Sequence, residues 1–228
     1  IILKLYMRLF LSYPLTNDTP SYGDRDSFNE SINSEILNGV GANTSKWVFT
    51  NNHLGTHVDT PFHFYNSGKK ILDYNPEEFF FYNIHILYKP QSKGELIDLT
   101  NQEILTIPSN TDFLIIKTDY CKLRGTQKYI FDNPGLDKKL ASKLKAFLPE
   151  LRVIGFDFIS LTSWNFREHG KESHRAFLGL DNNFLIVEDM DLTLITKKSK
   201  IRNLIMVPVR TNHGNGGPVT IISEINIK

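Results

Sequence analysis

Short apolar runs recur along most of this chain, and they constrain its fold more than any other feature. Each run is rich in aliphatic or β-branched residues and is bounded by Gly, Pro, Asn or Asp, a pattern that is typical of β-strands. Seven such runs lie at residues 84–88, 95–99, 112–118, 152–157, 183–189, 203–209 and 219–225. The chain is therefore expected to build a sheet with several strands.

The first 15 residues are also apolar, but they do not fit a membrane span. Lys4 and Arg8 interrupt the stretch, and Pro14 ends it short of the roughly 20 apolar residues that a spanning helix needs. The stretch lacks the small-residue cleavage pattern of a signal peptide, so we interpret it as an opening strand. Met7 is a candidate translation start, which leaves open whether residues 1–6 belong to the native chain.

A helical pattern interrupts the strands after Pro134. Its lysines mostly lie on the face opposite to its apolar residues. Asp132 or Asn133 is expected to cap this helix, and Pro134 is expected in its first turn. A shorter helix is expected after Thr100, where Glu103 completes a capping box. The apolar residues of the longer helix keep a spacing of three to four residues at Leu136, Leu140, Leu144, Phe147 and Leu151.

Composition describes an ordinary folded protein of 228 residues, with 40% hydrophobic and 22% charged residues. Lys and Arg exceed Asp and Glu by 26 − 25 = 1, so nucleic acid is not an expected partner. The single cysteine, Cys121, excludes both an intrachain disulfide and a four-cysteine zinc site, and it favours a cytoplasmic location. We find no linker or repeat and expect one domain over residues 1–228.

Residues 16–46 are rich in Asn, Ser, Asp and Gly, which favour turns. We interpret this segment as a long surface excursion. Such a loop is uncommon in a compact domain unless it is functional, so a lid over a site or an arm onto a neighbouring subunit is expected.

The densest group of chemically active residues lies within eleven positions and consists of His53, His57, Asp59 and His63. Zinc proteases that use two histidines four residues apart on a helix need Glu directly after the first one, and this chain has Leu54 there. The helical metalloprotease motif is therefore excluded.

The backbone between these residues is expected to be extended, because alternate positions are β-branched and Pro61 disfavours helix at the residue before it. In an extended chain His57 and Asp59 project from the same face, and Gly55 permits a bend that brings His53 toward them. Two imidazoles and a carboxylate suit zinc or manganese with open positions for water. The alternative is a loop with unrelated polar side chains.

The string HLGTHVDTPFH at 53–63 resembles the H-x-G-T-H-x-D-x-P-x-H signature of the cyclase family of metal-dependent hydrolases, which includes bacterial kynurenine formamidase and isatin hydrolase. The resemblance implies an α/β fold of the swivelling β/β/α type, with a mixed, curved, barrel-like sheet flanked by a few helices. Further similar segments follow in family order at 11–23, 112–120, 128–137, 153–161, 173–178, 184–190, 203–210 and 214–219.

The resemblance also implies roles for matching residues. His63 would be the general acid/base, and Asp59 would bridge two metal positions. The cofactor would be a divalent metal, zinc or alternatively manganese, with one or two ions per subunit. The complete ligand set would be His53, His57, Asp59, His174 and Glu188.

These roles predict metal-dependent hydrolysis of a carbonyl–nitrogen bond in a small-molecule amide. The expected activity is that of an arylformamidase, which converts N-formylkynurenine to kynurenine and formate. A cyclic-amide hydrolase of the isatin type, another amide or ester hydrolase, and a non-catalytic metal-binding scaffold are the alternatives. Residues 24–46 and 161–172, which are expected to line or cover the pocket, resemble no family segment, so the substrate stays open.

Other candidate ligands are interpreted as structural. His85 lies in an apolar run, His169 and His213 lie in Gly-containing segments expected to be loops, and Cys121 lacks a basic partner in sequence. The aromatic run at 77–83 exceeds what one strand face can bury, so we expect a homo-oligomer, a dimer or a tetramer.

Overall fold

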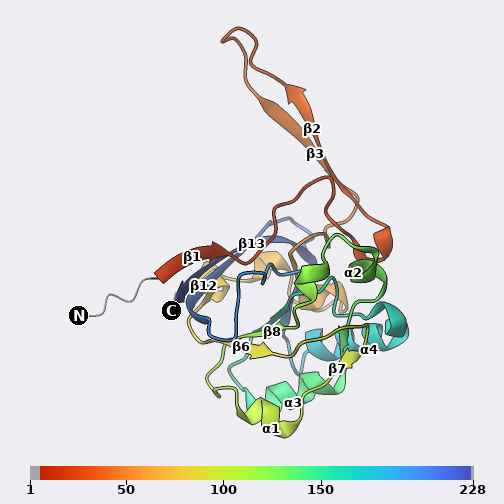
Figure 1. The fold of residues 1–228 in the computed structure, drawn as a ribbon, viewed down its shortest axis with the longest axis vertical. Coiled ribbons are helices and arrows are strands. Elements are labelled where there is room, and N and C mark those ends of the chain that lie inside the picture. Colours follow the sequence, from red (N-terminus) through yellow and green to blue (C-terminus); the bar gives the residue numbers. More distant parts are fainter. Residues whose placement is uncertain (1–5, 227–228) are drawn as a thin grey trace, which may run out of the picture.

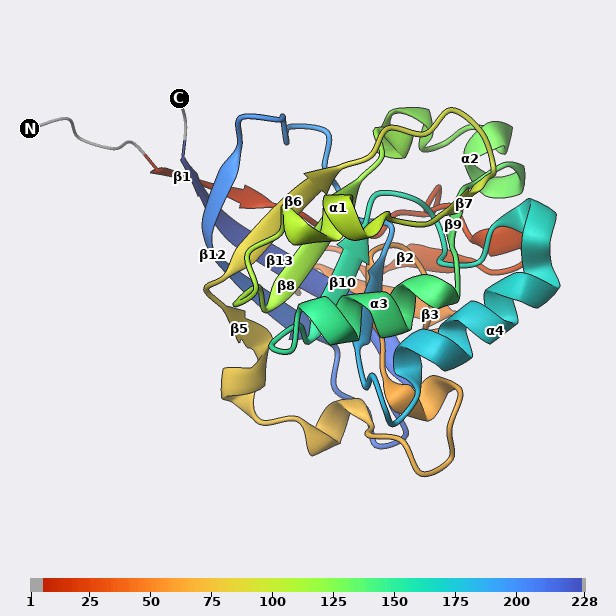
Figure 2. The same cartoon turned by 90° about the horizontal axis from the view of Figure 1, so that it is seen from below.

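Six of the seven apolar runs form one mixed sheet in the computed structural model, which describes residues 6–226, and the run at 95–99 lies outside this sheet (Figures 1 and 2). The strands follow the order β5-β12-β13-β4-β11-β10-β8-β6, and β1 pairs with β13 outside this path. Their bounds are β1 Tyr6–Phe10, β4 His57–Asp59, β5 Phe80–Phe81, β6 Ile84–Tyr88, β8 Phe113–Lys117, β10 Val153–Phe156, β11 Leu185–Glu188, β12 Lys200–Pro208 and β13 Gly216–Asn226.

The sheet changes strand direction at β4. Strands β6, β8, β10 and β11 are parallel, whereas β4 is antiparallel to both β11 and β13. Contacts between β6 and β12 bring the two ends of the sheet together, so it nearly closes into a barrel. The mixed, curved, barrel-like sheet predicted from the sequence is therefore confirmed.

Both faces of the central strands are buried, which explains why their sequences are apolar without alternation. In β8, Leu114 and Ile116 belong to the core beneath the helices. Phe113 and Ile115 belong to a second core on the other face of the sheet, together with Val58 of β4. The short ligand-bearing strand β4 thus lies between well-packed neighbours.

A few helices cover one face of the sheet (Figure 2), and α3 packs against both α1 and α4. The capping box at Thr100 is confirmed, because its side chain accepts from Glu103 N and the Glu103 carboxylate accepts from Thr100 N. Within residues 6–226, none of the helices combines the length and the apolar character that a membrane crossing requires. The helices are α1 Asn101–Leu105, α2 Gln127–Phe131, α3 Lys139–Phe147 and α4 Arg167–Leu178.

Short elements complete the chain. β7 (Leu96–Ile97) and β9 (Gly135–Leu136) form a separate parallel pair. Single turns of 3₁₀ helix connect the larger elements, and two of them, η1 and η2, adjoin the candidate site. These turns are η1 Tyr22–Asp24, η2 Pro61–His63, η3 Ile71–Asp73, η4 Pro76–Phe79, η5 Tyr120–Leu123 and η6 Trp164–Phe166.

The main helix begins later than the sequence predicts. Neither Asp132 nor Asn133 caps it, and Pro134 lies outside it, because α3 begins at Lys139. The side chain of Asp137 accepts a hydrogen bond from the Lys139 amide at 2.8 Å. The predicted first turn is thus not helical.

Hydrogen bonding explains the extended backbone at this point. The Gly135 amide donates to the Glu95 carbonyl at 3.0 Å, and the Leu136 amide donates to the Leu161 carbonyl at 3.0 Å. Leu136 is buried, as the helical spacing requires, but it belongs to the strand β9 and not to the helix. Apolar spacing therefore could not mark the start of the helix.

The polar segment 16–46 is not a plain loop. Residues Phe28–Ser34 (β2) and Thr44–Phe49 (β3) pair as an antiparallel hairpin that projects from the body (Figure 1). The predicted surface location is confirmed, but the predicted loop is wrong for residues 28–34 and 44–46, which are strand. Ile32 and Trp47 are 72% and 63% exposed on the hairpin, and its contact with a neighbouring subunit stays a prediction.

Residues 6–10 of the predicted opening strand are confirmed as β1, whereas residues 11–15 are not part of a strand and residues 1–5 lie outside the described part. In the aromatic run 77–83, Phe81 is fully buried, whereas Phe80 and Tyr82 are 40% and 67% exposed. The homo-oligomer inferred from this run stays a prediction.

Burial predicts the cost of shortening two helical leucines. Leu144→Ala in α3 removes a side chain that is 0% exposed, and we expect a loss of about 2–5 kcal/mol in the free energy of unfolding. Leu105→Ala in α1 is the matched control, because Leu105 is 68% exposed, and it should change stability by about 0.5 kcal/mol or less. Urea denaturation of both variants measures the difference, and equal losses would contradict this account of the core.

Candidate metal centre

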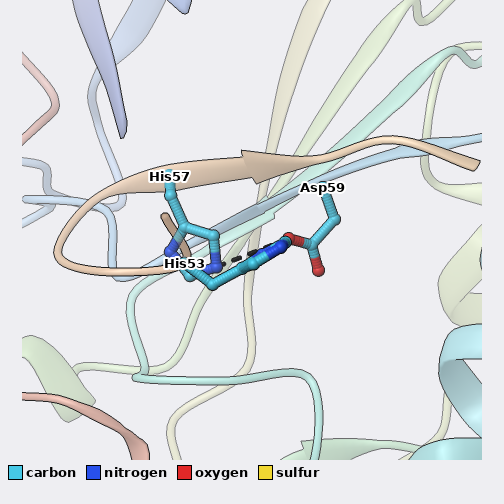
Figure 3. Close-up of side chains that lie close together, drawn as sticks. All are labelled: His53, His57 and Asp59. Carbon is cyan, nitrogen blue, oxygen red and sulfur yellow. Dashed lines mark hydrogen bonds and ion pairs between the residues drawn. The ribbon is translucent and has the colours of Figure 1, made fainter. Parts of the chain in front are cut away.

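Strand β4 presents two of the candidate ligands on one side. His57 and Asp59 are buried and point the same way from the strand, as Figure 3 shows. Glu188 of β11 is the register partner of His57, and Gly216 of β13 is the register partner of Asp59. Sheet pairing therefore places a carboxylate from another part of the chain directly beside the first two donors.

His53 reaches the same place by way of the bend predicted at Gly55, whose φ is +64°. Its Nδ1 lies 2.6 Å from Oδ1 of Asp59. A Cβ at Gly216 would lie 2.5 Å from the His53 ring, so only glycine leaves room for this histidine. The sequence signalled the need for Gly55 but not for Gly216.

Helix α4 brings the third imidazole, which is the most distant in sequence. Nε2 of His174 lies 3.6 Å from Oδ2 of Asp59 and 3.5 Å from Oε1 of Glu188. Nε2 of His57 lies 3.4 Å from a carboxylate oxygen of each of the same two residues. The structure thus brings all five residues predicted as ligands together, in two overlapping sets that share Asp59.

Backbone groups orient the donor atoms. The Nδ1 of His57 contacts the Gly55 carbonyl at 2.9 Å, and the Nδ1 of His174 contacts the Gly170 carbonyl at 3.0 Å. Each contact leaves the Nε2 atom facing the cluster. Glu188 is held by the Leu161 amide, which donates to Oε1 at 2.7 Å.

The imidazoles and carboxylates of the cluster shift each other's pKa values toward the charged forms. Burial opposes protonation of His57, but the carboxylates of Asp59 and Glu188 outweigh it and raise the pKa of His57 to about 9. The same groups outweigh burial at His174 and raise its pKa to about 10. Burial also opposes ionisation of Asp59, but the imidazoles, His53 foremost, hold its pKa well below the usual range.

This donor set fits a divalent metal. Buried imidazole nitrogens lie 3.4 and 3.5 Å from carboxylate oxygens, and a cation held between them would balance the same negative charge, with release of protons from the ligands. Mixed nitrogen and oxygen donors suit zinc or manganese. The chemistry of these residues therefore supports a metal centre at β4, α4 and β11.

His63 lies beside this cluster rather than among its donor atoms. It ends the turn η2, and its ring stacks on His53 at 4.0 Å between centroids. Burial lowers the pKa of His63 to about 4, so the ring is neutral at neutral pH and is able to accept a proton. Its role as acid/base stays a prediction.

A cavity of about 240 Å³ opens at the centre. Residues that sequence reasoning did not single out line it, from η1, from the start of the hairpin and from the segment before α4. They carry no recognisable motif, and only the expectation that residues 24–46 and 161–172 approach the pocket pointed to some of them. These lining residues include Tyr22, Arg25, Asp26, Asn51, Ser160 and Thr162.

A buried ion pair anchors the residue after Glu188. Asp189 has a φ of +52°, and Arg124 donates to both of its carboxylate oxygens, with Nη2 2.8 Å from Oδ2. Tyr129 donates to the same carboxylate, and the Thr56 hydroxyl donates to the Asp189 carbonyl. The ion pair thus fixes the residue after β11, and the Thr56 hydrogen bond ties it to the residue before β4, two links that sequence reasoning missed.

The remaining candidates lie away from the clustered donors of the described chain. His85 lies on β6 and His213 is exposed in a loop, whereas His169 is 3.4 Å from Asp137. The loop predicted at His169 is wrong, because the residue belongs to α4. Cys121 is buried as expected, and burial raises the pKa of its thiol to about 12, which disfavours the thiolate form.

The profile of a family described as "Putative cyclase" matches residues 9–162, which is more than half of the 228 residues. The chain belongs to this family. The resemblance seen in the sequence is thereby confirmed, and the ligand string at 53–63 falls inside the matched region.

Individual proteins similar to this chain have names that agree with the family assignment. Kynurenine formamidase of Bacillus mycoides (strain KBAB4) is 26% identical over 215 residues, which cover 93% of this chain and 94% of that protein. Isatin hydrolase A from Labrenzia aggregata, solved with benzyl benzoate, superposes with a TM-score of 0.77 at 18% identity, covering 97% and 94% of the two chains. A predicted metal-dependent hydrolase from Bacillus stearothermophilus has a TM-score of 0.70 at 16% identity, covering 96% and 98%. The structural similarities show a shared fold, and the comparisons together support a hydrolase of the cyclase family.

Gly216→Ala tests the packing of the centre. The new methyl group would press on the His53 ring at 2.5 Å and on the Val58 carbonyl at 2.6 Å, so we expect zinc affinity to fall about 10- to 100-fold. Gly217→Ala is the control, because its Cβ would lie 3.5 Å from the nearest atom, the Val209 carbonyl. Competition with a chelator measures the zinc affinity. Thermal unfolding of the metal-free variants shows whether the substitution also lowers the stability of the protein. Wild-type affinity in a folded Gly216→Ala protein would contradict the placement of His53.

Proposed function

We propose that this protein is a metal-dependent amidohydrolase, and specifically an arylformamidase that converts N-formylkynurenine to kynurenine and formate. The observation that supports the proposal is the convergence of five candidate metal ligands next to a neutral histidine, His63, in one cavity. Zinc is the proposed metal, manganese is the alternative, and two donor sets that share Asp59 would accommodate one or two ions.

The chemistry divides between the cation and the chain. A bound divalent cation supplies Lewis acidity, which can lower the pKa of water from 15.7 to about 7 and can stabilise negative charge on a carbonyl oxygen. His57, His174 and Glu188 hold their donor atoms inward through the backbone contacts described above. These contacts keep the donor atoms facing the place where the cation would be held.

His63 would transfer the proton. Its neutral ring accepts a proton from the attacking water and returns it to the nitrogen of the departing arylamine, which leaves more readily when protonated. The ring is held by stacking on His53 and by edge contact with Phe64, with a centroid distance of 4.8 Å to the latter. These contacts keep the imidazole beside the donor cluster.

The lining of the cavity and the names of the relatives both favour an aromatic amide as the substrate. Phe64, Ile159 and Tyr22 provide apolar wall beside the donors, which suits an aryl ring. Relatives that span 93% of this chain are named kynurenine formamidase. A cyclic amide such as isatin is the alternative substrate, because a structurally similar protein is an isatin hydrolase and the same centre would serve both reactions.

Chelation provides a direct test of the proposed activity. We expect the purified protein to contain zinc or manganese by elemental analysis, to lose hydrolysis of N-formylkynurenine on chelation, and to regain it when the metal is restored. Absorbance assays with N-formylkynurenine and isatin compare the two substrates. Activity that survives complete removal of metal would refute metal dependence, and bound metal without hydrolysis of amides, lactams or esters would indicate a scaffold.

Two substitutions separate metal binding from proton transfer. Asp59→Ala removes the carboxylate shared by both donor sets, so we expect loss of both bound metal and turnover. His63→Ala should retain metal but lower kcat by about 10²- to 10⁴-fold.

The exposed residues Asp18 and His213 provide the matched controls Asp18→Ala and His213→Ala, which should behave as wild type. Elemental analysis and kcat are measured on all four variants. Wild-type turnover in His63→Ala would eliminate the acid/base role, and full metal content in Asp59→Ala would eliminate the shared ligand.

A further inference from the structure

A second hollow adjoins the cavity of the candidate metal centre. The two have Tyr22, Arg25 and Thr162 in common as wall residues. The second hollow has a volume of about 640 Å³. We call it the outer hollow, and its remaining wall consists of Asn165, Phe166, Arg167, Glu168, His169 and Lys171.

Two arginines face this hollow from different parts of the chain. Arg25 follows η1, and its guanidinium lies 5.6 Å from the centre of the Tyr22 ring. Arg167 begins α4, and its guanidinium lies 4.9 Å from the centre of the Trp164 ring. Because the Tyr22 and Trp164 rings pack edge to face at 5.4 Å, the two cations flank a single aromatic pair.

The positive charge in the hollow is not neutralised by the protein. Lys171 is paired with Glu168 at 2.7 Å. Neither Arg25 nor Arg167 lies within ion-pair distance of a carboxylate in the described range 6–226. The planar guanidinium group is well suited to bind a carboxylate through paired hydrogen bonds.

The hydroxyl of Tyr22 marks the junction between the hollow and the centre. It is buried and has no hydrogen-bond partner among the described residues. Burial raises the pKa of Tyr22 to about 12, while Arg167 and Arg25 act to lower it and Glu188 acts to raise it. This hydroxyl is therefore a protonated donor within electrostatic reach of both arginines and of a candidate metal ligand. Buried polar groups are normally satisfied, so a ligand is the expected partner.

We propose that the outer hollow binds the carboxylate of an anionic substrate through Arg25 and Arg167, while the scissile amide lies at the metal centre and Tyr22 donates a hydrogen bond to the part between them. The inference rests on the proposed function and narrows it to aryl amides that carry a carboxylate at a distance from the reacting bond. N-formylkynurenine has such a group, whereas isatin is uncharged. The arginines thus determine specificity and take no part in bond cleavage.

A matched pair of substrates tests the role of this charge. N-formylkynurenine and its methyl ester contain the same formamide and aromatic ring, but only the former carries the carboxylate. We expect the wild-type KM to be about tenfold lower for the acid than for the ester. In the double variant Arg25→Gln/Arg167→Gln this ratio should fall toward one through a rise in the KM of the acid. Arg8→Gln, an exposed arginine on β1, is the control and should preserve the wild-type ratio.

The outcomes separate the inference from the proposed function. Cleavage of both substrates with the same KM ratio in wild type and double variant would overturn the role of the arginines and leave the arylformamidase standing. Cleavage of neither substrate by the metal-loaded wild type would overturn the proposed function itself. A ratio that falls in the double variant but not in Arg8→Gln would support both.

Discussion

Two carboxylates buried among imidazoles are the constraint on which the site depends. Asp59 and Glu188 are 1% and 4% exposed, and an unpaired charge at such depth would cost several kcal/mol. The fold meets this cost by converging histidines from one bend, one strand and one helix on the same oxygens. A divalent cation site requires this combination of oriented nitrogen donors and buried negative charge. In the binding mode that we propose, the positive charge of Arg25 and Arg167 in the outer hollow would attract an anionic substrate toward the candidate cation centre.

Most of the sheet was predictable because its strands are buried on both faces. The run at 112–118 is apolar at successive positions, and every residue of β8 is buried. The hairpin of β2 and β3 gave no such signal, because it projects into solvent and every residue of its two strands except Phe28 is exposed. The start of α3 was misplaced because Leu136 satisfies the helical spacing from within a strand. Apolar periodicity indicates which residues are buried, and Leu136 would be buried in a helix as well as in a strand.

The local part of the site was predictable from backbone chemistry. Gly55 implied the bend at His53, and the β-branched residues implied the extended strand that aligns His57 with Asp59. His174 and Glu188 were found only through resemblance to a family, since no rule of spacing links them to residues more than a hundred positions earlier. The wall residues of the cavity were missed because their function arises from packing alone.

Diffraction data at the absorption edge of the metal test the central claim most directly. Crystals grown with zinc should give an anomalous peak about 2.0–2.2 Å from Nε2 of His57 and from an oxygen of Asp59, as expected for zinc coordinated by nitrogen and oxygen. A second peak, if both positions fill, should lie at similar distances from His174 and Glu188. Crystals with ample zinc whose anomalous peaks all lie elsewhere, with these side chains pointing apart, would contradict the account.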